Sequence, residues 1–128
     1  MDYLDVLYEI ADLLPRSEEY NVKSQMLRPG TSITLNIAEG STGQTDTEQT
    51  RFIGISLRSL FETVGCQHII YRRKWLANKD LLCKSYRMAS DLAPRISKLR
   101  ITLDPDQHWV REETAEYSVE EKCPFEDE

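Results

Sequence analysis

The sequence predicts an all-α fold, namely an antiparallel up-down-up-down four-helix bundle. The chain has 128 residues, which is enough to bury a core without disulfides or metal. It contains only five glycines and five prolines. Apolar residues recur at three- and four-residue spacing in four segments, which short polar turns separate. We expect residues 1–103 to form the bundle, and residues 104–128 to form an acidic C-terminal tail that is disordered or loosely docked.

The first two predicted helices run from about Asp2 to Leu14 and from about Tyr20 to Glu39. A proline stops the first helix and a glycine ends the second. The core face of the second helix is predicted from four apolar residues, Val22, Met26, Ile33 and Ile37. Pro29 and Gly30 lie in the middle of this helix. Because proline lacks a backbone donor and glycine is a poor helix former, we expect a kink or a local break there.

The third predicted helix is the longest, from about Thr47 to Leu76, with Asp46 or Thr47 as its N-terminal cap. It carries two separate apolar stripes. A core within one chain needs only one such face, so the second stripe indicates that this helix also lines a contact between subunits. The interface candidates are Phe52, Ile55, Ser59 and Ile69.

The fourth predicted helix runs from about Lys79 to Leu99 or slightly beyond. Asn78 lies in the turn before it, and Pro94 is expected to kink it. The sequence after this helix has weak periodicity and strong negative charge, which favours a tail over another core element.

The net charge of −6 is unevenly distributed along the chain. Residues 104–128 hold ten acids and two bases, a net charge of −8, whereas residues 21–103 hold thirteen bases and six acids, a net charge of +7. The sequence therefore predicts a basic body with an acidic tail.

The basic body indicates a surface for nucleic acid, because phosphate contacts from several lysines and arginines add up. The candidates are Arg51, Arg58, Arg72, Arg73, Lys74, Lys84 and Arg87. The alternative is a solvated helix face with ion pairs between subunits. The acidic tail could also fold back on this surface and compete with nucleic acid.

A polar stripe lies on one face of the second helix and consists of Gln25, Arg28, Ser32, Asn36 and Glu39. We expect a structural polar network that fixes helix register at an interface. An enzymatic site is the alternative, and it ranks below because the pattern implies no pairing of a nucleophile with a base. Both histidines, His68 and His108, stand alone, and His68, Cys66 and Cys83 do not have the spacing that a zinc site needs. The chain also has no nucleotide-binding motif. We therefore expect no catalytic residue, no metal and no cofactor.

The three cysteines, Cys66, Cys83 and Cys123, are widely spaced and odd in number. This pattern argues against a disulfide framework, so we expect two partly buried thiols and one thiol in the tail. The chain has neither a signal-peptide pattern nor an apolar run long enough to span a bilayer, and we expect a cytoplasmic protein without membrane contact.

The stretch LPRSEEYNVKSQMLRPGTSITLNIAEG, followed by RFIGISLRSLFET, resembles the four-helix-bundle proteins encoded in intervening sequences of bacterial 23S ribosomal RNA genes. The resemblance covers roughly residues 4–101. The positions that carry it are Gln25, Leu27, Arg28, Ser32, Ile33, Asn36, Ile37, Ala38, Glu39, Gly40, Arg51, Phe52, Ser59, Leu60 and Glu62. Pro29-Gly30 departs from the family pattern, which more often has alanines there, and the acidic tail lies outside it.

The resemblance implies an antiparallel bundle that assembles into a homo-oligomeric ring, commonly a pentamer. A looser resemblance is to the accessory variability protein of diversity-generating retroelements, a basic pentamer that works with a reverse transcriptase and nucleic acid. We therefore expect a non-enzymatic scaffold or accessory protein that contacts RNA, DNA or a nucleic-acid enzyme. The alternative is a homo-oligomeric assembly module that binds only protein.

Overall fold

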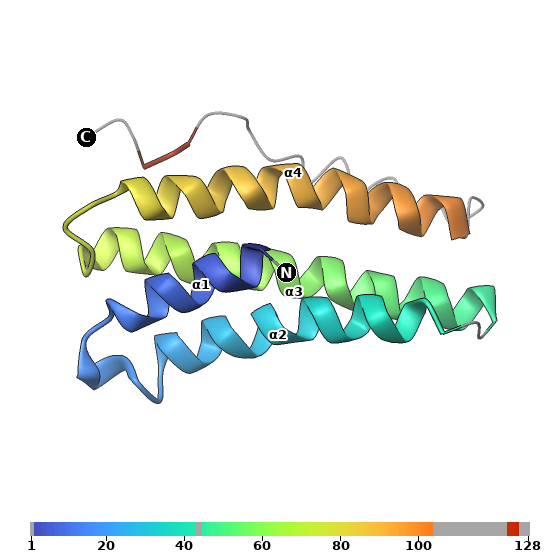
Figure 1. Cartoon of the computed structure of the whole chain (residues 1–128), viewed down its shortest axis with the longest axis horizontal. Helices are drawn as coiled ribbons and strands as arrows, with labels where there is room; N and C mark the ends of the chain where they lie inside the picture. The colour runs from blue at the N-terminus through green and yellow to red at the C-terminus, as the bar shows by residue number, and fades with distance from the viewer. Residues whose placement is uncertain (1, 43–44, 104–122, 126–128) are drawn as a thin grey trace.

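The computed structural model describes residues 2–42, 45–103 and 123–125, and these residues form helices and no strand. The elements are α1 (Asp2–Asp12), the short 3₁₀ helix η1 (Arg16–Glu18), α2 (Val22–Gly40), α3 (Asp46–Arg73) and α4 (Asp80–Leu103). In Figure 1 the four α-helices lie side by side, and each runs back along the one before it. The predicted all-helical fold with four helices is confirmed.

The ends of α3 differ from the prediction. Thr45, not Asp46 or Thr47, caps the helix, and its side chain accepts a hydrogen bond from the backbone N–H of Glu48. The helix ends at Arg73 because Lys74 adopts the left-handed conformation with φ 57°. Trp75 and Leu76 extended the apolar pattern of the sequence, but they pack on the core after the helix has ended.

The two helix-internal prolines do not interrupt their helices, so the break that we expected at Pro29 is absent. Pro29 and Gly30 are both buried in the packed middle of α2. A Cβ atom on Gly30 would lie 2.8 Å from Leu7 Cδ1, which shows how closely α1 approaches here. Packing on both sides therefore keeps the helix together although Pro29 cannot donate its hydrogen bond. Pro94 lies at an exposed position within α4.

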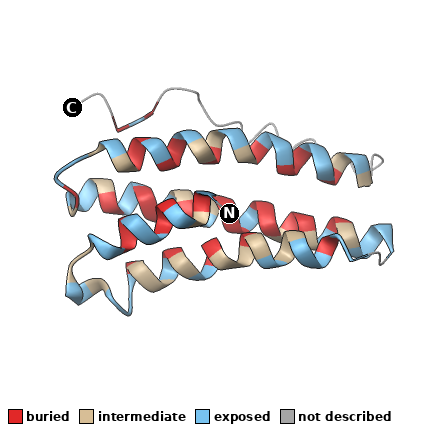
Figure 2. Ribbon diagram, viewed as in Figure 1, coloured by how far each residue is buried: buried red, intermediate tan, exposed pale blue. Residues whose placement is uncertain are grey.

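The core lies between the four helices, and each of them carries buried residues, drawn in red in Figure 2. α3 packs against α2 and α4, and α1 covers the opposite side between α2 and α4. The predicted core residues Val22, Met26 and Ile33 are buried, and Ile37 is half-buried. Burial of such a side chain stabilises the fold by roughly 1.5–3 kcal/mol.

A chain of buried hydrogen bonds joins α1, α3 and α4 across this core. Gln67 Nε2 donates to the Tyr3 hydroxyl at 2.8 Å, and that hydroxyl lies 2.8 Å from Thr63 Oγ1. Thr63 donates its own proton to a backbone carbonyl at 2.6 Å, so Tyr3 is the donor to Thr63. On the other side of Gln67, the hydroxyl of Ser85 donates to Oε1 at 2.7 Å. The sequence pattern did not predict this network.

Alkaline pH should destabilise the fold through Tyr3. Burial raises the pKa of the Tyr3 hydroxyl from 10.0 to about 12, more than its hydrogen bonds to Thr63 and Gln67 lower it. The folded state therefore keeps a proton that the unfolded state loses. The stabilisation is complete below pH 10 and is lost as the pH rises through 12, at about 1.4 kcal/mol per pH unit within that window. Urea unfolding of the native chain between pH 9 and 12, with Tyr3→Phe as control, should show a steeper decline only for the native chain.

Candidate functional site

The seven candidate bases are all exposed, and they fall into two groups. Arg51, Arg58 and Arg72 are separated by seven and by fourteen residues along α3, so they share one face of that helix. The second group lies at the end of the bundle where α3 turns into α4. It comprises Arg72, Arg73 and Lys74 from α3 and its cap, and Lys84 and Arg87 from the first two turns of α4, and we call these five residues the basic cluster.

The local structure favours cations at this end of α3. Arg72 and Arg73 occupy the last helical turn, where the negative end of the helix dipole stabilises positive charge. The Arg73 guanidinium lies 5.8 Å from the centroid of the Trp75 ring. Lys79 Nζ lies 5.4 Å from the centroid of the Tyr71 ring. Two aromatic rings thus lie against cations at this end of the bundle. Aromatic rings in such a place can also stack on nucleic-acid bases.

A cavity of about 380 Å³ opens beside the basic cluster, in the turn between α3 and α4. Its lining residues are Tyr71, Lys74, Leu76, Ala77, Lys79 and Leu82. The two lysines can bind an anionic group such as a phosphate, and the aromatic ring beside them can stack against a flat group such as a base. Lys79 therefore joins Lys74, one of the predicted bases, as a residue that could face a phosphate. Lys79 was not among the predicted candidates.

The predicted polar stripe of α2 is only partly brought together within one chain. Asn36 Nδ2 lies 2.8 Å from both the carbonyl oxygen and Oγ of Ser32, and Ser59 Oγ donates to Ser32 Oγ at 3.1 Å. This small network ties α2 to α3. Gln25, Arg28 and Glu39 lie at exposed positions instead.

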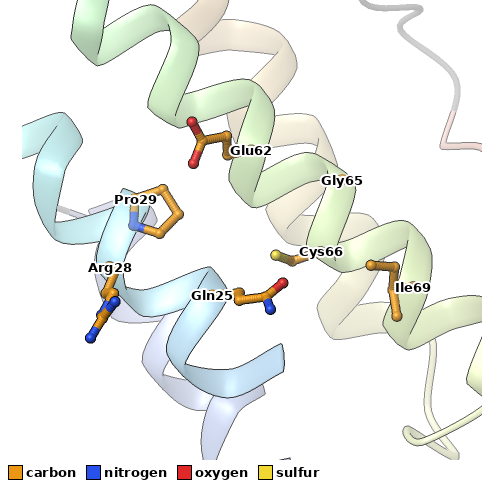
Figure 3. Close-up of a pocket in the computed structure, with 7 residues that line it drawn as sticks. All are labelled: Gln25, Arg28, Pro29, Glu62, Gly65, Cys66 and Ile69. Carbon is orange, nitrogen blue, oxygen red and sulfur yellow. The ribbon is translucent and has the colours of Figure 1, made fainter. Parts of the chain in front are cut away.

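A second hollow lies between α2 and α3, with a volume of about 540 Å³ (Figure 3). It is lined by Gln25, Arg28, Pro29, Glu62, Gly65, Cys66 and Ile69. Burial raises the pKa of the Cys66 thiol, and the charge of Glu62 adds to this effect. The thiolate form is therefore disfavoured, which is the opposite of what a nucleophilic cysteine needs. Among the described residues, no group of three or more His, Cys, Asp or Glu side chains could hold a metal ion.

The interface candidates on α3 differ in how far they remain accessible. Ile69 is 43% exposed, and Phe52 and Ile55 are half-buried. Ser59 is buried, and its hydroxyl is engaged with Ser32 of the same chain. An apolar surface on α3 thus remains available to a partner, but the side chain of Ser59 lies beneath it.

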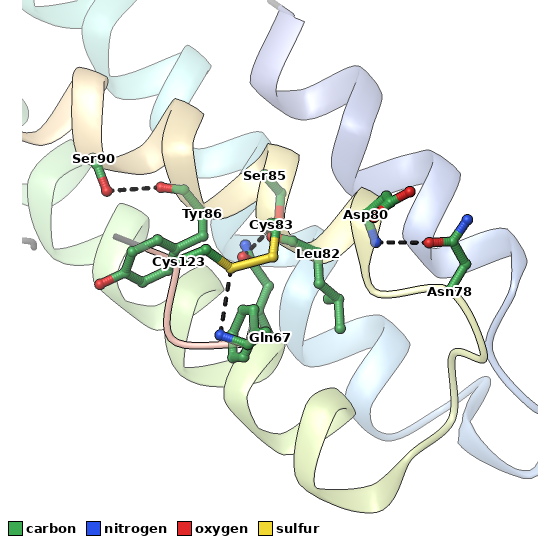
Figure 4. The surroundings of a disulfide bond; sticks show 10 residues. Gln67, Asn78, Asp80, Leu82, Cys83, Ser85, Tyr86, Ser90 and Cys123 are labelled. Carbon is green, nitrogen blue, oxygen red and sulfur yellow. Dashed lines mark hydrogen bonds between the residues drawn. A yellow bond between two sulfur atoms is a disulfide. The ribbon is translucent and has the colours of Figure 1, made fainter. Parts of the chain in front are cut away.

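The prediction that the cysteines form no disulfide is wrong. Cys83 of α4 is bonded to Cys123, with their Cα atoms 5.5 Å apart (Figure 4). Two residues further on, Phe125 is fully buried. Cys66 keeps a free thiol, as expected. The forty-residue separation hid the bond, because helical periodicity carries no information about where a distant segment returns.

Phe125 sits in an aromatic cluster formed by α3 and α4. Its ring centroid lies 4.7 Å from that of Tyr71, 5.2 Å from His68 and 5.9 Å from Tyr86. Partial burial lowers the pKa of His68, which favours the neutral imidazole in this cluster. The tail boundary at residue 104 lies at the edge of the described residues, and most of the predicted tail lies outside them.

Comparison with known protein families identifies the family to which the chain belongs. A family model described as 23S rRNA-intervening sequence protein matches residues 1–98, about three quarters of the chain. The chain belongs to this family. The resemblance in the sequence is therefore confirmed, and the match of the 23S rRNA-intervening sequence protein family stops before the acidic tail. No curated protein and no solved structure matches the chain significantly. None of the helices within the described residues is long and apolar enough to cross a membrane.

Proposed function

We propose that this member of the 23S rRNA-intervening sequence protein family is a non-enzymatic scaffold or accessory protein of the cytoplasm. Its subunit is an antiparallel up-down-up-down bundle, and the subunits assemble into a homo-oligomeric ring, such as a pentamer. The ring contacts RNA or DNA, or a nucleic-acid enzyme such as a reverse transcriptase, through the basic cluster and the arginines of α3.

The observation that carries the proposal is the concentration of exposed cations at one end of the bundle, in a chain whose net charge is −6. Solubility alone would be served by mixed charges spread over the surface. A ring would repeat the basic cluster in every subunit and let one nucleic-acid strand meet several copies.

Arg72→Gln/Arg73→Gln should weaken binding of a single-stranded RNA of mixed sequence. Each lost phosphate contact lowers the slope of log K against log salt by about 0.7, so the double variant should lose about 1.4 from this slope. At low salt we expect affinity to fall by roughly 50-fold or more. Fluorescence anisotropy at several salt concentrations measures both quantities.

The matched control is Arg95→Gln/Lys98→Gln, which removes the same charge from two exposed positions near the other end of α4. It should retain most of the affinity and slope. Equal losses in the two variants would mean that only net charge matters. No binding by the native protein at low salt, with or without a thiol reductant, would favour the second candidate function, a homo-oligomer that binds only protein. The exposed Ile69 and the hollow between α2 and α3 favour that alternative.

A further inference from the structure

The C-terminal sequence is attached to the bundle by a covalent and an apolar anchor. Cys123 is bonded to Cys83 near the start of α4, and both cysteines are buried. Phe125 fills the space between Tyr71, His68 and Tyr86. Figure 4 shows the bond lying along α4, beside Leu82 and Tyr86. Apolar contact alone would have to offset the entropy of fixing a distant segment of the chain on the bundle, whereas the disulfide closes the loop between Cys83 and Cys123 covalently.

These anchors lie beside the basic cluster. Phe125 contacts Tyr71, which directly precedes Arg72, and Lys79 approaches the ring of the same tyrosine. Lys84 follows Cys83 in the sequence, and Arg87 comes one turn later. The aromatic cluster and the basic cluster therefore share the same end of α3 and α4.

The sequence that these anchors hold is strongly acidic. Between Leu103 and Cys123 it contains seven acids and two bases, and Phe125 is followed by Glu-Asp-Glu. Three residues span at most about 10 Å, so chain length alone tethers the last three carboxylates to the seat of Phe125. Such tethering raises the local concentration of carboxylates that compete with phosphates.

We propose that the Cys83–Cys123 disulfide and Phe125 form a thiol-reversible latch, which holds the acidic C-terminal sequence at the basic cluster and weakens nucleic-acid binding in the oxidised protein. This inference rests on the proposed function and adds its regulation. A dithiol reductant opens the latch. One thiolate of the reductant attacks a sulfur of the bond, and the departing cysteine thiolate takes up a proton. The second thiol of the reductant then displaces the other cysteine, which leaves two cysteine thiols and an oxidised reductant.

The first measurement concerns the bond itself. Protein purified without reductant and then unfolded should present one thiol, that of Cys66, and should present three after reduction. Its intact mass should rise by two hydrogens on reduction. Three thiols without reductant would overturn the latch directly, whatever the protein binds.

The second measurement compares the binding of a labelled single-stranded RNA of mixed sequence to the oxidised and the reduced protein. Reduction should tighten binding roughly tenfold at low salt, the value of about one phosphate contact, and the difference should shrink as salt rises. Cys123→Ser should bind like the reduced protein under both conditions. Cys66→Ser, which leaves the latch intact, should respond to reductant like the native chain.

A charge variant tests the acidic sequence while the bond stays closed. Glu126→Gln/Asp127→Asn/Glu128→Gln should bind RNA more tightly than the native chain when both are oxidised. Equal binding by oxidised and reduced native protein would overturn the latch but leave the proposed function standing. If neither the reduced protein nor Cys123→Ser binds at low salt, both proposals fail.

Discussion

Replacing Ile55 and Ile69 by glutamate should dissociate the proposed ring into single subunits of 14.9 kDa. The two positions lie fourteen residues apart on α3, so they share one face about 21 Å in length. Neither isoleucine is fully covered within one chain. In an interface each would contribute roughly 1.5–3 kcal/mol of apolar burial. A glutamate there loses that contribution and brings a charge that must be desolvated, so two substitutions suffice to abolish assembly at micromolar concentration.

Light scattering coupled to size-exclusion chromatography gives the mass of the native protein and of the double variant. Leu13→Glu is the matched control, since Leu13 is 60% exposed and lies outside α3. It should leave the assembly intact. Circular dichroism should show the same helix content in all three proteins, because the substituted side chains lie outside the buried core. A native protein that elutes as a single subunit would contradict the assembly proposal, and an intact double variant would place the interface elsewhere.

The helices could be predicted from the sequence because each has an apolar face that repeats with helical spacing. Met26 and Ile33 show this well, since both are predicted core residues and both are fully buried. Helix ends were harder to predict. Trp75 and Leu76 continued the apolar pattern past the true end of α3, and local backbone conformation at Lys74 decided where the helix stops. Such a choice depends on tertiary packing, which periodicity does not report.

The candidate site was predicted in its residue types but not in its surroundings. Exposed arginines and lysines stand out in the sequence because they break the apolar pattern, and all seven candidates are exposed. The anchors beside them depend on contacts between residues far apart in the chain. Cys83 and Cys123 are forty residues apart, and Phe125 stands in an acidic sequence with no periodicity. The available signal for a docked C-terminal segment was the pair Cys123 and Phe125, which stand close together in an otherwise acidic sequence.

Gln67→Ala should produce the largest loss of stability of any polar substitution in the core. The Gln67 side chain is fully buried and joins Tyr3 to Ser85, so its removal breaks the link between α1 and α4. The lost hydrogen bonds cost roughly 1–3 kcal/mol, and the cavity left by the shortened side chain adds to this. We expect a total of about 3–4 kcal/mol in urea unfolding at neutral pH, measured at fixed protein concentration because the proposed assembly would contribute to stability.

Gln67→Met separates the two contributions, because methionine keeps the volume and loses the amide. Its cost should be smaller, roughly 1–2 kcal/mol, since Tyr3 can still donate to Thr63 and Ser85 lies 2.9 Å from the carbonyl oxygen of Leu82. Tyr3→Phe in the native background leaves the Gln67 amide without its acceptor, whereas in the Gln67→Met background no amide remains to be satisfied. The cost of Tyr3→Phe should therefore fall by about 1–2 kcal/mol when both substitutions are combined. Strictly additive costs would show that Tyr3 and Gln67 do not act as a pair, and that apolar packing alone positions α1 on α3 and α4.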